Sequence, residues 1–129
     1  MKILVADGLD PEGIALLRTQ AEVDAPSGLR PEDLPAAIRD ADAVVVRSRT
    51  RITAEVLQHA PRLRVIARAG VGVDNIETDA ATRRGILVLN APESSTVSTA
   101  EHTMAMLLAL ARRIPAAQSA AAQGTWTRE

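Results

Sequence analysis

Short apolar runs alternate along the chain with longer polar stretches in which apolar residues recur at helical spacing. The runs have the length of buried strands and predict strands at 2–6, 22–24, 43–46, 63–67 and 86–89. The stretches between them predict helices at 11–19, 31–40, 53–59 and 78–84. Strands that alternate with helices indicate βαβ units, so the sequence predicts an α/β fold with a doubly wound parallel sheet.

Proline and glycine support several of these boundaries. Pro11 and Pro31 stand at expected first helical turns, where the missing amide hydrogen costs little. Gly85 directly follows the helix predicted at 78–84, and we expect it to end that helix in a left-handed conformation.

The pattern changes after residue 90. Segment 90–96 contains proline and hydroxyl residues and predicts a hinge or domain junction. Ser98 and Glu101 have the spacing of a capping box that would open a long helix at 97–113. Residues 104–111 are apolar almost all round that helix, so we expect burial against more than one neighbour. An alanine-rich stretch, 116–123, predicts a further helix that ends at Gly124.

Composition narrows the classes of function. The chain has 129 residues, a formal net charge of −1 and no cysteine, which is compatible with a cytoplasmic protein and predicts no thiol catalysis. Its arginines are scattered among acids, so no nucleic-acid partner is predicted, and no apolar run is long enough to predict a membrane span. Trp126 is the only aromatic residue, which disfavours flavin binding.

Polar groups follow the predicted strands at the point where each strand ends. Asp7 follows the first strand, Arg47 and Ser48 the third, Arg68 the fourth and Asn90 the fifth. Right-handed crossovers bring the carboxyl ends of parallel strands to one edge of a sheet. The two arginines and the amides of 70–72 are therefore predicted to converge on one carboxylate or phosphate. The alternative is that each arginine pairs with a surface acid.

The glycine turn at 70–72 resembles an incomplete dinucleotide motif. Gly70 and Gly72 have the G-x-G spacing, but Asn75 stands where the third glycine would be. A plain strand-to-helix turn explains this pattern equally well, so no cofactor-binding residue is assigned. No metal site is predicted either, because His59 and His102 suit exposed or hydrogen-bonded helical positions.

Taken together, several short motifs resemble the N-terminal part of the NAD-dependent D-2-hydroxyacid dehydrogenases, in the branch that oxidises 3-phosphoglycerate. The motifs run in order along the whole chain. They are Val46-Arg47-Ser48, Ala67-Arg68-Ala69-Gly70-Val71-Gly72-Val73-Asp74-Asn75, Asn90-Ala91-Pro92, Ala100-Glu101-His102 and Gly124-Thr125-Trp126-Thr127-Arg128.

The resemblance implies a flavodoxin-like fold with five parallel strands in the order 2-1-3-4-5. Residues 1–92 would form an incomplete substrate-binding domain, and 93–129 the hinge and first helices of a nucleotide-binding domain. It also implies that one set of residues lines the pocket for a small anionic substrate similar to 3-phosphoglycerate. These are Arg47, Ser48, Arg68, Ala69, Gly70, Val71 and Gly72.

The same resemblance sets limits on what this chain does. The family's dinucleotide fingerprint and its catalytic arginine, glutamate and histidine match no residues here, so no catalytic residue is assigned. NAD is expected in the parent enzyme and not on this chain, which we expect to be a fragment and inactive alone. Glu93 and Ser95 depart from the family pattern near the hinge.

Two alternative hypotheses of function stay open beside the oxidation of 3-phosphoglycerate in a parent enzyme. They are another D-2-hydroxyacid dehydrogenase, or a flavodoxin-like module that binds small anions without catalysis. A signalling receiver domain and flavodoxin itself fit poorly, because the expected acceptor, lysine and aromatic residues are missing. The apolar helix at 97–113 predicts a homodimer or a fold-back onto the sheet, and we favour the homodimer.

Overall fold

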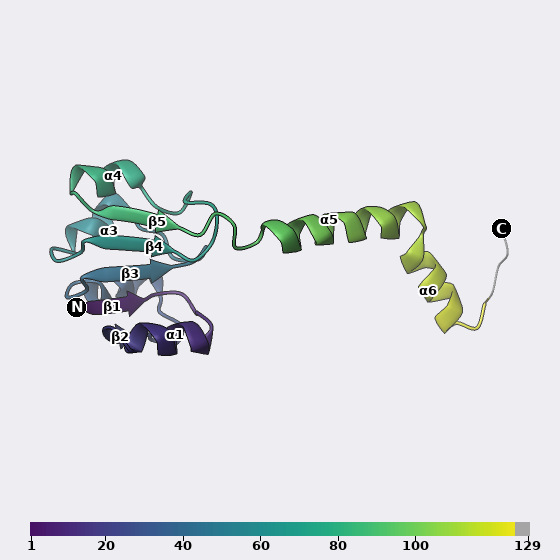
Figure 1. The fold of residues 1–129 in the computed structure, drawn as a ribbon, viewed down its shortest axis with the longest axis horizontal. Helices are drawn as coiled ribbons and strands as arrows, with labels where there is room; N and C mark the ends of the chain where they lie inside the picture. The colour runs from purple at the N-terminus through teal and green to yellow at the C-terminus, as the bar shows by residue number, and fades with distance from the viewer. Residues whose placement is uncertain (126–129) are drawn as a thin grey trace. The chain divides into compact units, whose positions relative to one another are not determined.

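A parallel five-stranded sheet is the centre of the fold. The computed structural model describes residues 1–125, and the Trp126-Thr127-Arg128 part of the last motif lies outside them. The strands are β1 (Lys2–Val5), β2 (Glu22–Asp24), β3 (Ala43–Val46), β4 (Val65–Arg68) and β5 (Leu87–Asn90). Their order is β2-β1-β3-β4-β5, which confirms the predicted α/β class and strand order (Figure 1).

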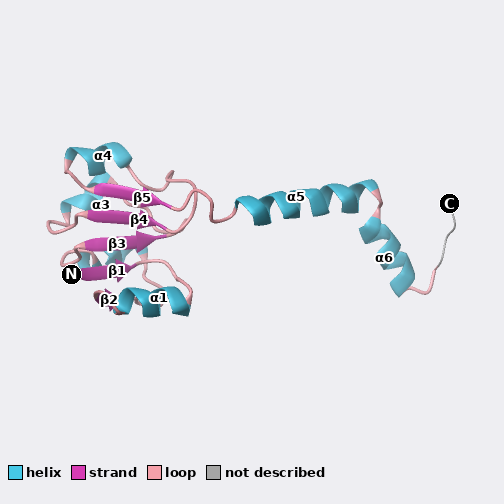
Figure 2. Ribbon diagram, viewed as in Figure 1, coloured by secondary structure: helices cyan, strands magenta, loops and turns pink. Residues whose placement is uncertain are grey.

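The helices between the strands are short. They are α1 (Pro11–Arg18), the 3₁₀ turn η1 (Pro31–Asp33), α2 (Leu34–Ala37), α3 (Ala54–Gln58) and α4 (Thr78–Arg83) (Figure 2). Pro11 lies in the first turn of α1, and Gly85 has φ +69° directly after the end of α4, as predicted.

The single helix predicted at 31–40 is wrong. The structure has the 3₁₀ turn η1 followed by the one-turn helix α2, with Pro35 in the first turn of α2. A proline ring clashes with the carbonyl four residues earlier, which here belongs to Pro31. The helix therefore has to start again before Pro35.

The main core lies between one face of the sheet and helices α2, α3 and α4. Val44 and Ile66 are register partners and are both fully buried, and Val88 continues their row on β5. Leu57 of α3 and Ala81 of α4 pack into the same core. This row of apolar side chains thus runs across β3, β4 and β5.

The other face of the sheet is covered less evenly. Ile3 and Val5 of β1 are buried on the face of α1, which lies beside β1 and β2 (Figure 1). Near β5 this face of the sheet is not covered, since Leu87 is 55% and Leu89 is 47% exposed. Parallel sheets are normally covered on both faces, so β5 has an uncovered apolar side in the part of the chain described.

The described residues divide into two compact units, Met1–Ser94 and the segment from Ser95 onward. The second unit consists of α5 (Thr96–Ala111) and α6 (Ile114–Ala122), separated at Arg113, which has φ 52°. No helix among the residues described is long and apolar enough to cross a membrane.

Two details of the second unit differ from the prediction. The capping box is wrong, because the helix already begins at Thr96 and the Ser98 hydroxyl donates to the carbonyl of Ser95, 3.2 Å away. No residue of α5 is buried in the single chain, although burial was expected. Its exposed apolar side chains are Val97, Met104, Met106, Leu107, Leu108 and Leu110.

Candidate anion-binding site

The loops that follow β3, β4 and β5 meet at one edge of the sheet. Val46, Arg68 and Asn90 are register neighbours on three successive strands, and the amide of Ala69 donates to the carbonyl of Val46 at 2.8 Å. Arg47 therefore directly follows Val46, the residue of β3 that pairs with Arg68. The end of β3 and the start of the segment after β4 thus lie side by side at this edge.

Asp7, two residues after the end of β1, binds the loop that follows β3. Its carboxylate is 4% exposed and accepts hydrogen bonds from the amides of Arg47 (2.7 Å) and Thr50 (3.2 Å). The Thr50 hydroxyl donates a third bond, at 2.8 Å. The guanidinium Nε of Arg49 lies 3.7 Å from the same carboxylate. Three hydrogen bonds and one long ion pair thus tie Asp7 to the segment 47–50.

These contacts set the acidity of Asp7. Burial alone would raise the pKa of its carboxyl group. The hydrogen bonds from Arg47 and Thr50, with a smaller contribution from the charge of Arg49, outweigh burial and hold the pKa below its ordinary value. The carboxylate is therefore ionised and acts only as an acceptor at neutral pH.

Asn75 binds the same loop from the β4 side. Its side chain is buried, and Nδ2 donates to the carbonyls of Arg47 (2.7 Å) and Thr50 (2.6 Å). The carbonyl of Asn75 accepts from the amide of Ile52 at 2.9 Å. Asn75 is thus a hydrogen-bond donor to the β3 loop, which explains why a glycine would not serve at this position.

Arg68 and Gly70 form a compact unit at the end of β4. Gly70 has φ +154°, and a Cβ placed on it would lie 2.9 Å from the guanidinium carbon of Arg68. The guanidinium therefore packs directly over the glycine, in space that any side chain would fill. The buried Nε of Arg68 has no hydrogen-bond partner among residues 1–125.

The turn after Arg68 is fixed by several backbone contacts. The amide of Gly70 donates to the carbonyl of Arg68 at 2.9 Å, and the carbonyl of Gly70 accepts from Ala91 at 2.9 Å. The Asn90 side chain donates to the carbonyl of Val71 at 2.7 Å. Within the described part of the chain, the amides of Val71 and Gly72 donate to no protein acceptor.

Arg47 and Ser48 are exposed at the mouth of a small pocket. This pocket has a volume of about 220 Å³ and is lined by Asp7, Gly8, Arg47, Ser48 and Arg49. The one contact of the Arg47 guanidinium in the described region is long, 3.4 Å from Nη1 to the carbonyl of Gly8. A cationic side chain held this loosely is available to an incoming anion.

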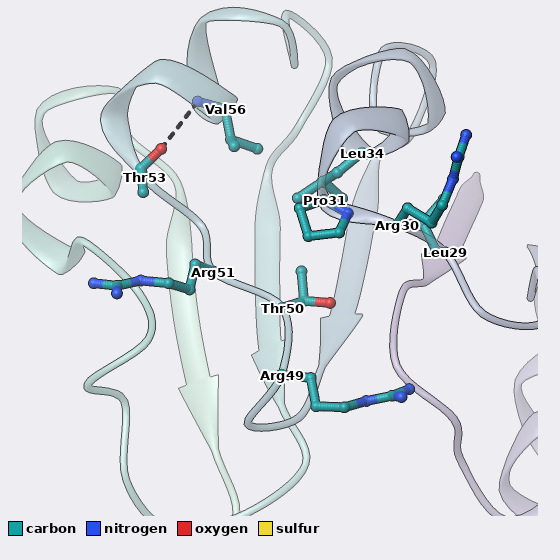
Figure 3. Close-up of a pocket in the computed structure, with 9 residues that line it drawn as sticks. All are labelled: Leu29, Arg30, Pro31, Leu34, Arg49, Thr50, Arg51, Thr53 and Val56. Atoms are coloured by element: carbon teal, nitrogen blue, oxygen red, sulfur yellow. Dashed lines mark hydrogen bonds between the residues drawn. The ribbon is translucent and has the colours of Figure 1, made fainter.

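A larger pocket lies on the other side of the same loop. Its volume is about 470 Å³, and Leu29, Pro31, Leu34 and Val56 contribute most of its apolar lining (Figure 3). None of the residues predicted for the substrate site lines it. The guanidinium groups drawn in Figure 3 point in different directions, and that of Arg30 is paired with Asp33 at 2.8 Å. The size of this pocket therefore does not mark it as the anion site.

Sequence reasoning missed the residues that hold the site together. The sequence pattern puts Asp7 on the correct edge without indicating a role for it, and it indicates for Asn75 only the absence of a glycine. Thr50 and Arg49 were not singled out. The signal for Arg49 was available, because it repeats the charge of Arg47 two residues on. The bonds of Asp7 and Asn75 join segments 25 to 43 residues apart, which no local pattern reveals.

The turn at 70–75 does not fit a dinucleotide. A dinucleotide fingerprint opens directly into a helix whose amides face the pyrophosphate. Here α4 begins only at Thr78, and Asn75 is engaged with the β3 loop. Among the described residues there is also no cluster of His, Cys, Asp or Glu that could hold a metal ion.

Comparison with known proteins identifies the family of this chain. Residues 3–129 match the sequence model of the D-isomer specific 2-hydroxyacid dehydrogenase catalytic domain. The chain therefore belongs to the D-isomer specific 2-hydroxyacid dehydrogenase family. It is 49% identical over its whole length to a D-3-phosphoglycerate dehydrogenase of Methanocaldococcus jannaschii, of which it covers 25%. The chain thus spans about a quarter of the length of such curated relatives.

Two solved structures have a fold similar to that of this chain. A Thermus thermophilus protein of 35% identity superposes with a TM-score of 0.88, over 100% of this chain and 42% of that one. An NAD⁺-bound 3-phosphoglycerate dehydrogenase of Entamoeba histolytica, 30% identical, has a TM-score of 0.73 over 84% of this chain and 38% of that one.

Proposed function

We propose that residues 1–92 form the larger part of a substrate-binding domain that holds 3-phosphoglycerate for NAD-dependent oxidation. The observation that carries the proposal is the adjacency of the β3 and β4 loops, which brings Arg47 beside the segment that follows Arg68. Residues 93–129 would then contribute the hinge and the first helices of a nucleotide-binding domain.

The chemistry of the two loops suits a carboxylate or a phosphate. Arg47 and Arg68 supply charge-assisted donors, Ser48 a hydroxyl, and Val71 and Gly72 backbone amides. Ala69 and Gly70 shape the turn that presents those amides. An anion held in this way fixes the substrate relative to the reacting carbon, which lowers the entropic part of the barrier.

The chemical step itself is assigned to no residue of this chain. NAD would accept the hydride in the whole enzyme, but the turn at 70–75 does not fit that cofactor. What this chain contributes is binding and orientation of the substrate. The names of its relatives support 3-phosphoglycerate as that substrate and NAD as the oxidant. Its lack of cysteine suits the reducing cytoplasm, where we place the protein.

Calorimetric titration of the chain tests the proposed substrate. We expect 3-phosphoglycerate to bind more tightly than inorganic phosphate or D-lactate, because two anionic groups on one carbon skeleton can reach separate donors. Equal affinity for 3-phosphoglycerate and inorganic phosphate would instead favour a module that binds small anions. Tighter binding of D-lactate would favour a different D-2-hydroxyacid dehydrogenase.

We also propose that the partner of α5 is a second copy of the chain. Leu107, Leu108 and Leu110 are between 53% and 81% exposed, and Met104 and Met106 are more than half exposed. Burial of each such side chain stabilises by roughly 1.5–3 kcal/mol, so their sum is comparable with the stability of a small domain. Association of two α5 helices removes this surface from water in both copies.

A further inference from the structure

Asp7 and Asn75 act on the same two residues of the β3 loop. At Arg47 and at Thr50 the amide donates to the Asp7 carboxylate and the carbonyl accepts from Asn75. Each of these loop positions therefore has both of its backbone polar groups bound by buried side chains from outside the loop. Ser48 and Arg49, between these positions, are exposed.

We propose that Asp7 and Asn75 are positioning residues, which hold the 47–50 loop in the conformation that presents Arg47, Ser48 and Arg49 to an anionic substrate. This inference rests on the proposed function and deepens it. Neither residue needs to touch the substrate, since both are buried and already bonded to the loop backbone.

The chemistry of each side chain matches its position. Two backbone amides and one hydroxyl converge on Asp7, and an ionised carboxylate is the side chain that can accept all three. Two carbonyls converge on the Nδ2 group of Asn75, which has two hydrogens to donate. An aspartate at residue 75 would place negative charge against two carbonyl oxygens.

The arrangement of the Asn75 side chain is not ideal for stability. Its Oδ1 is buried and has no partner in the part of the chain described. A buried polar atom without a partner is costly, so the two bonds from Nδ2 have to outweigh that cost. A side chain that served packing alone would be apolar at this position.

The consequence is that the loop is ordered before the ligand arrives. Fixing a flexible backbone costs free energy at every residue, and a preformed loop has met this cost during folding. The positive charges of Arg47 and Arg49 would otherwise favour a splayed loop. Asp7 supplies the compensating negative charge from beneath it.

Amide hydrogen exchange and ligand titration test the proposal together. The variants are Asn75→Ala, which removes only bonds to carbonyls, Asn75→Gln as the conservative rescue, and Asp7→Asn. In Asn75→Ala we expect faster exchange at the amides of Arg47 and Thr50, although their acceptor Asp7 is untouched. We expect 3-phosphoglycerate binding to weaken about tenfold in Asn75→Ala and Asp7→Asn, and to recover at least partly in Asn75→Gln.

Asp42→Asn is the matched control. Asp42 also accepts a backbone amide across two strands, from Lys2 at 2.7 Å, but it precedes β3 and lies away from the loop. We expect this variant to bind 3-phosphoglycerate like the wild type. If Asn75→Ala does not fold, Thr50→Val removes one bond to Asp7 and takes its place.

The outcomes separate this proposal from the proposed function. Unchanged exchange at Arg47 and Thr50 in Asn75→Ala, or an affinity loss no greater than that of Asp42→Asn, would overturn the positioning role. A different outcome is that the wild type does not bind 3-phosphoglycerate, but Asn75→Ala exchanges faster at the amides of Arg47 and Thr50. That result would reject 3-phosphoglycerate as the substrate and would still support the positioning of the loop by Asn75.

Discussion

The Asp7 carboxylate and the Asn75 amide bind opposite polar groups of the same residue, Arg47, each at 2.7 Å. Asp7 accepts from its amide and Asn75 donates to its carbonyl. Asp7 lies in the loop after β1 and Asn75 in the segment between β4 and α4, and β1 and β4 flank β3 in the sheet. The backbone of the candidate anion site is thus held by the chain segments that follow the strands on both sides of β3.

The two arginines of the site should each contribute to anion binding. We expect Arg47→Ala or Arg68→Ala to weaken 3-phosphoglycerate binding by roughly 1.5–3 kcal/mol, the scale of charge-assisted hydrogen bonds. Lysine at either position should restore only part of the lost affinity, because its ammonium group lacks the planar fork of donors of a guanidinium. Calorimetry measures the effect, with Arg83→Ala on the exposed surface of α4 as the control. Equal binding by the wild type and the double alanine variant would remove the site from consideration.

Gly70 should be required for the placement of Arg68. Alanine at residue 70 would introduce a Cβ into the space of the Arg68 guanidinium, which must then move. We expect Gly70→Ala to weaken 3-phosphoglycerate binding by about tenfold, while its cooperative unfolding is retained. Gly13→Ala in α1, where the Cβ makes an ordinary contact of 3.4 Å with Leu9, should bind normally. Normal binding by Gly70→Ala would show that binding of 3-phosphoglycerate does not require the observed position of the Arg68 guanidinium.

Acid should destabilise the fold partly through Asp7. Its pKa is lower in the folded chain than the unfolded value of about 3.9, so its ionised form stabilises the fold above that pH. This contribution is lost as the pH falls through the folded pKa. Urea unfolding between pH 7 and pH 2 should show a shallower loss of stability below about pH 4 for Asp7→Asn than for the wild type. Parallel curves for the two proteins would contradict the assignment.

The two faces of the sheet should differ in their sensitivity to truncation. Ile66 is fully buried on the face of α2, α3 and α4, whereas Leu87 on the adjacent strand is 55% exposed. We expect Ile66→Ala to cost about 2–5 kcal/mol of unfolding free energy and Leu87→Ala about 1 kcal/mol or less. Chemical denaturation gives both values. Similar losses would mean that the Leu87 face is covered in solution.

Association should depend on α5. We expect the unmodified chain to sediment as a dimer, and the double variant Leu107→Glu, Leu110→Glu to sediment as a monomer or to unfold, because charge opposes burial of that helix. Leu16→Glu is the control, since Leu16 is 70% exposed on α1. A monomer at every concentration of the unmodified chain would reject association through α5.

No residue of this chain has an assigned role in the chemical step, and the turn at 70–75 lacks the form that binds a dinucleotide. We therefore expect no NADH from the purified 129-residue chain with NAD and 3-phosphoglycerate. Absorbance at the NADH band measures this. Steady NADH formation that Arg68→Ala abolishes would contradict it.

The sequence by itself determined the class of fold and the edge of the sheet at which the candidate site lies. Apolar runs, Pro11 and Gly85 act through local backbone geometry, so they predicted the strands and most helix ends without knowledge of contacts. Pro35 is the same kind of local signal and argues against one long helix at 31–40. The right-handed crossover rule then placed Arg47 and Arg68 on one edge.

Only the tertiary structure decided how the site is held. The bonds of Asp7 to Arg47 and of Asn75 to Thr50 span 40 and 25 residues, and nothing near any of these residues in sequence specifies its partner. The packing of Arg68 over Gly70 likewise depends on the φ angle of Gly70, which cannot be read from the amino-acid sequence. Side-chain hydrogen bonds depend on positions within tenths of an ångström, and those positions exist only once β1, β3 and β4 lie in register.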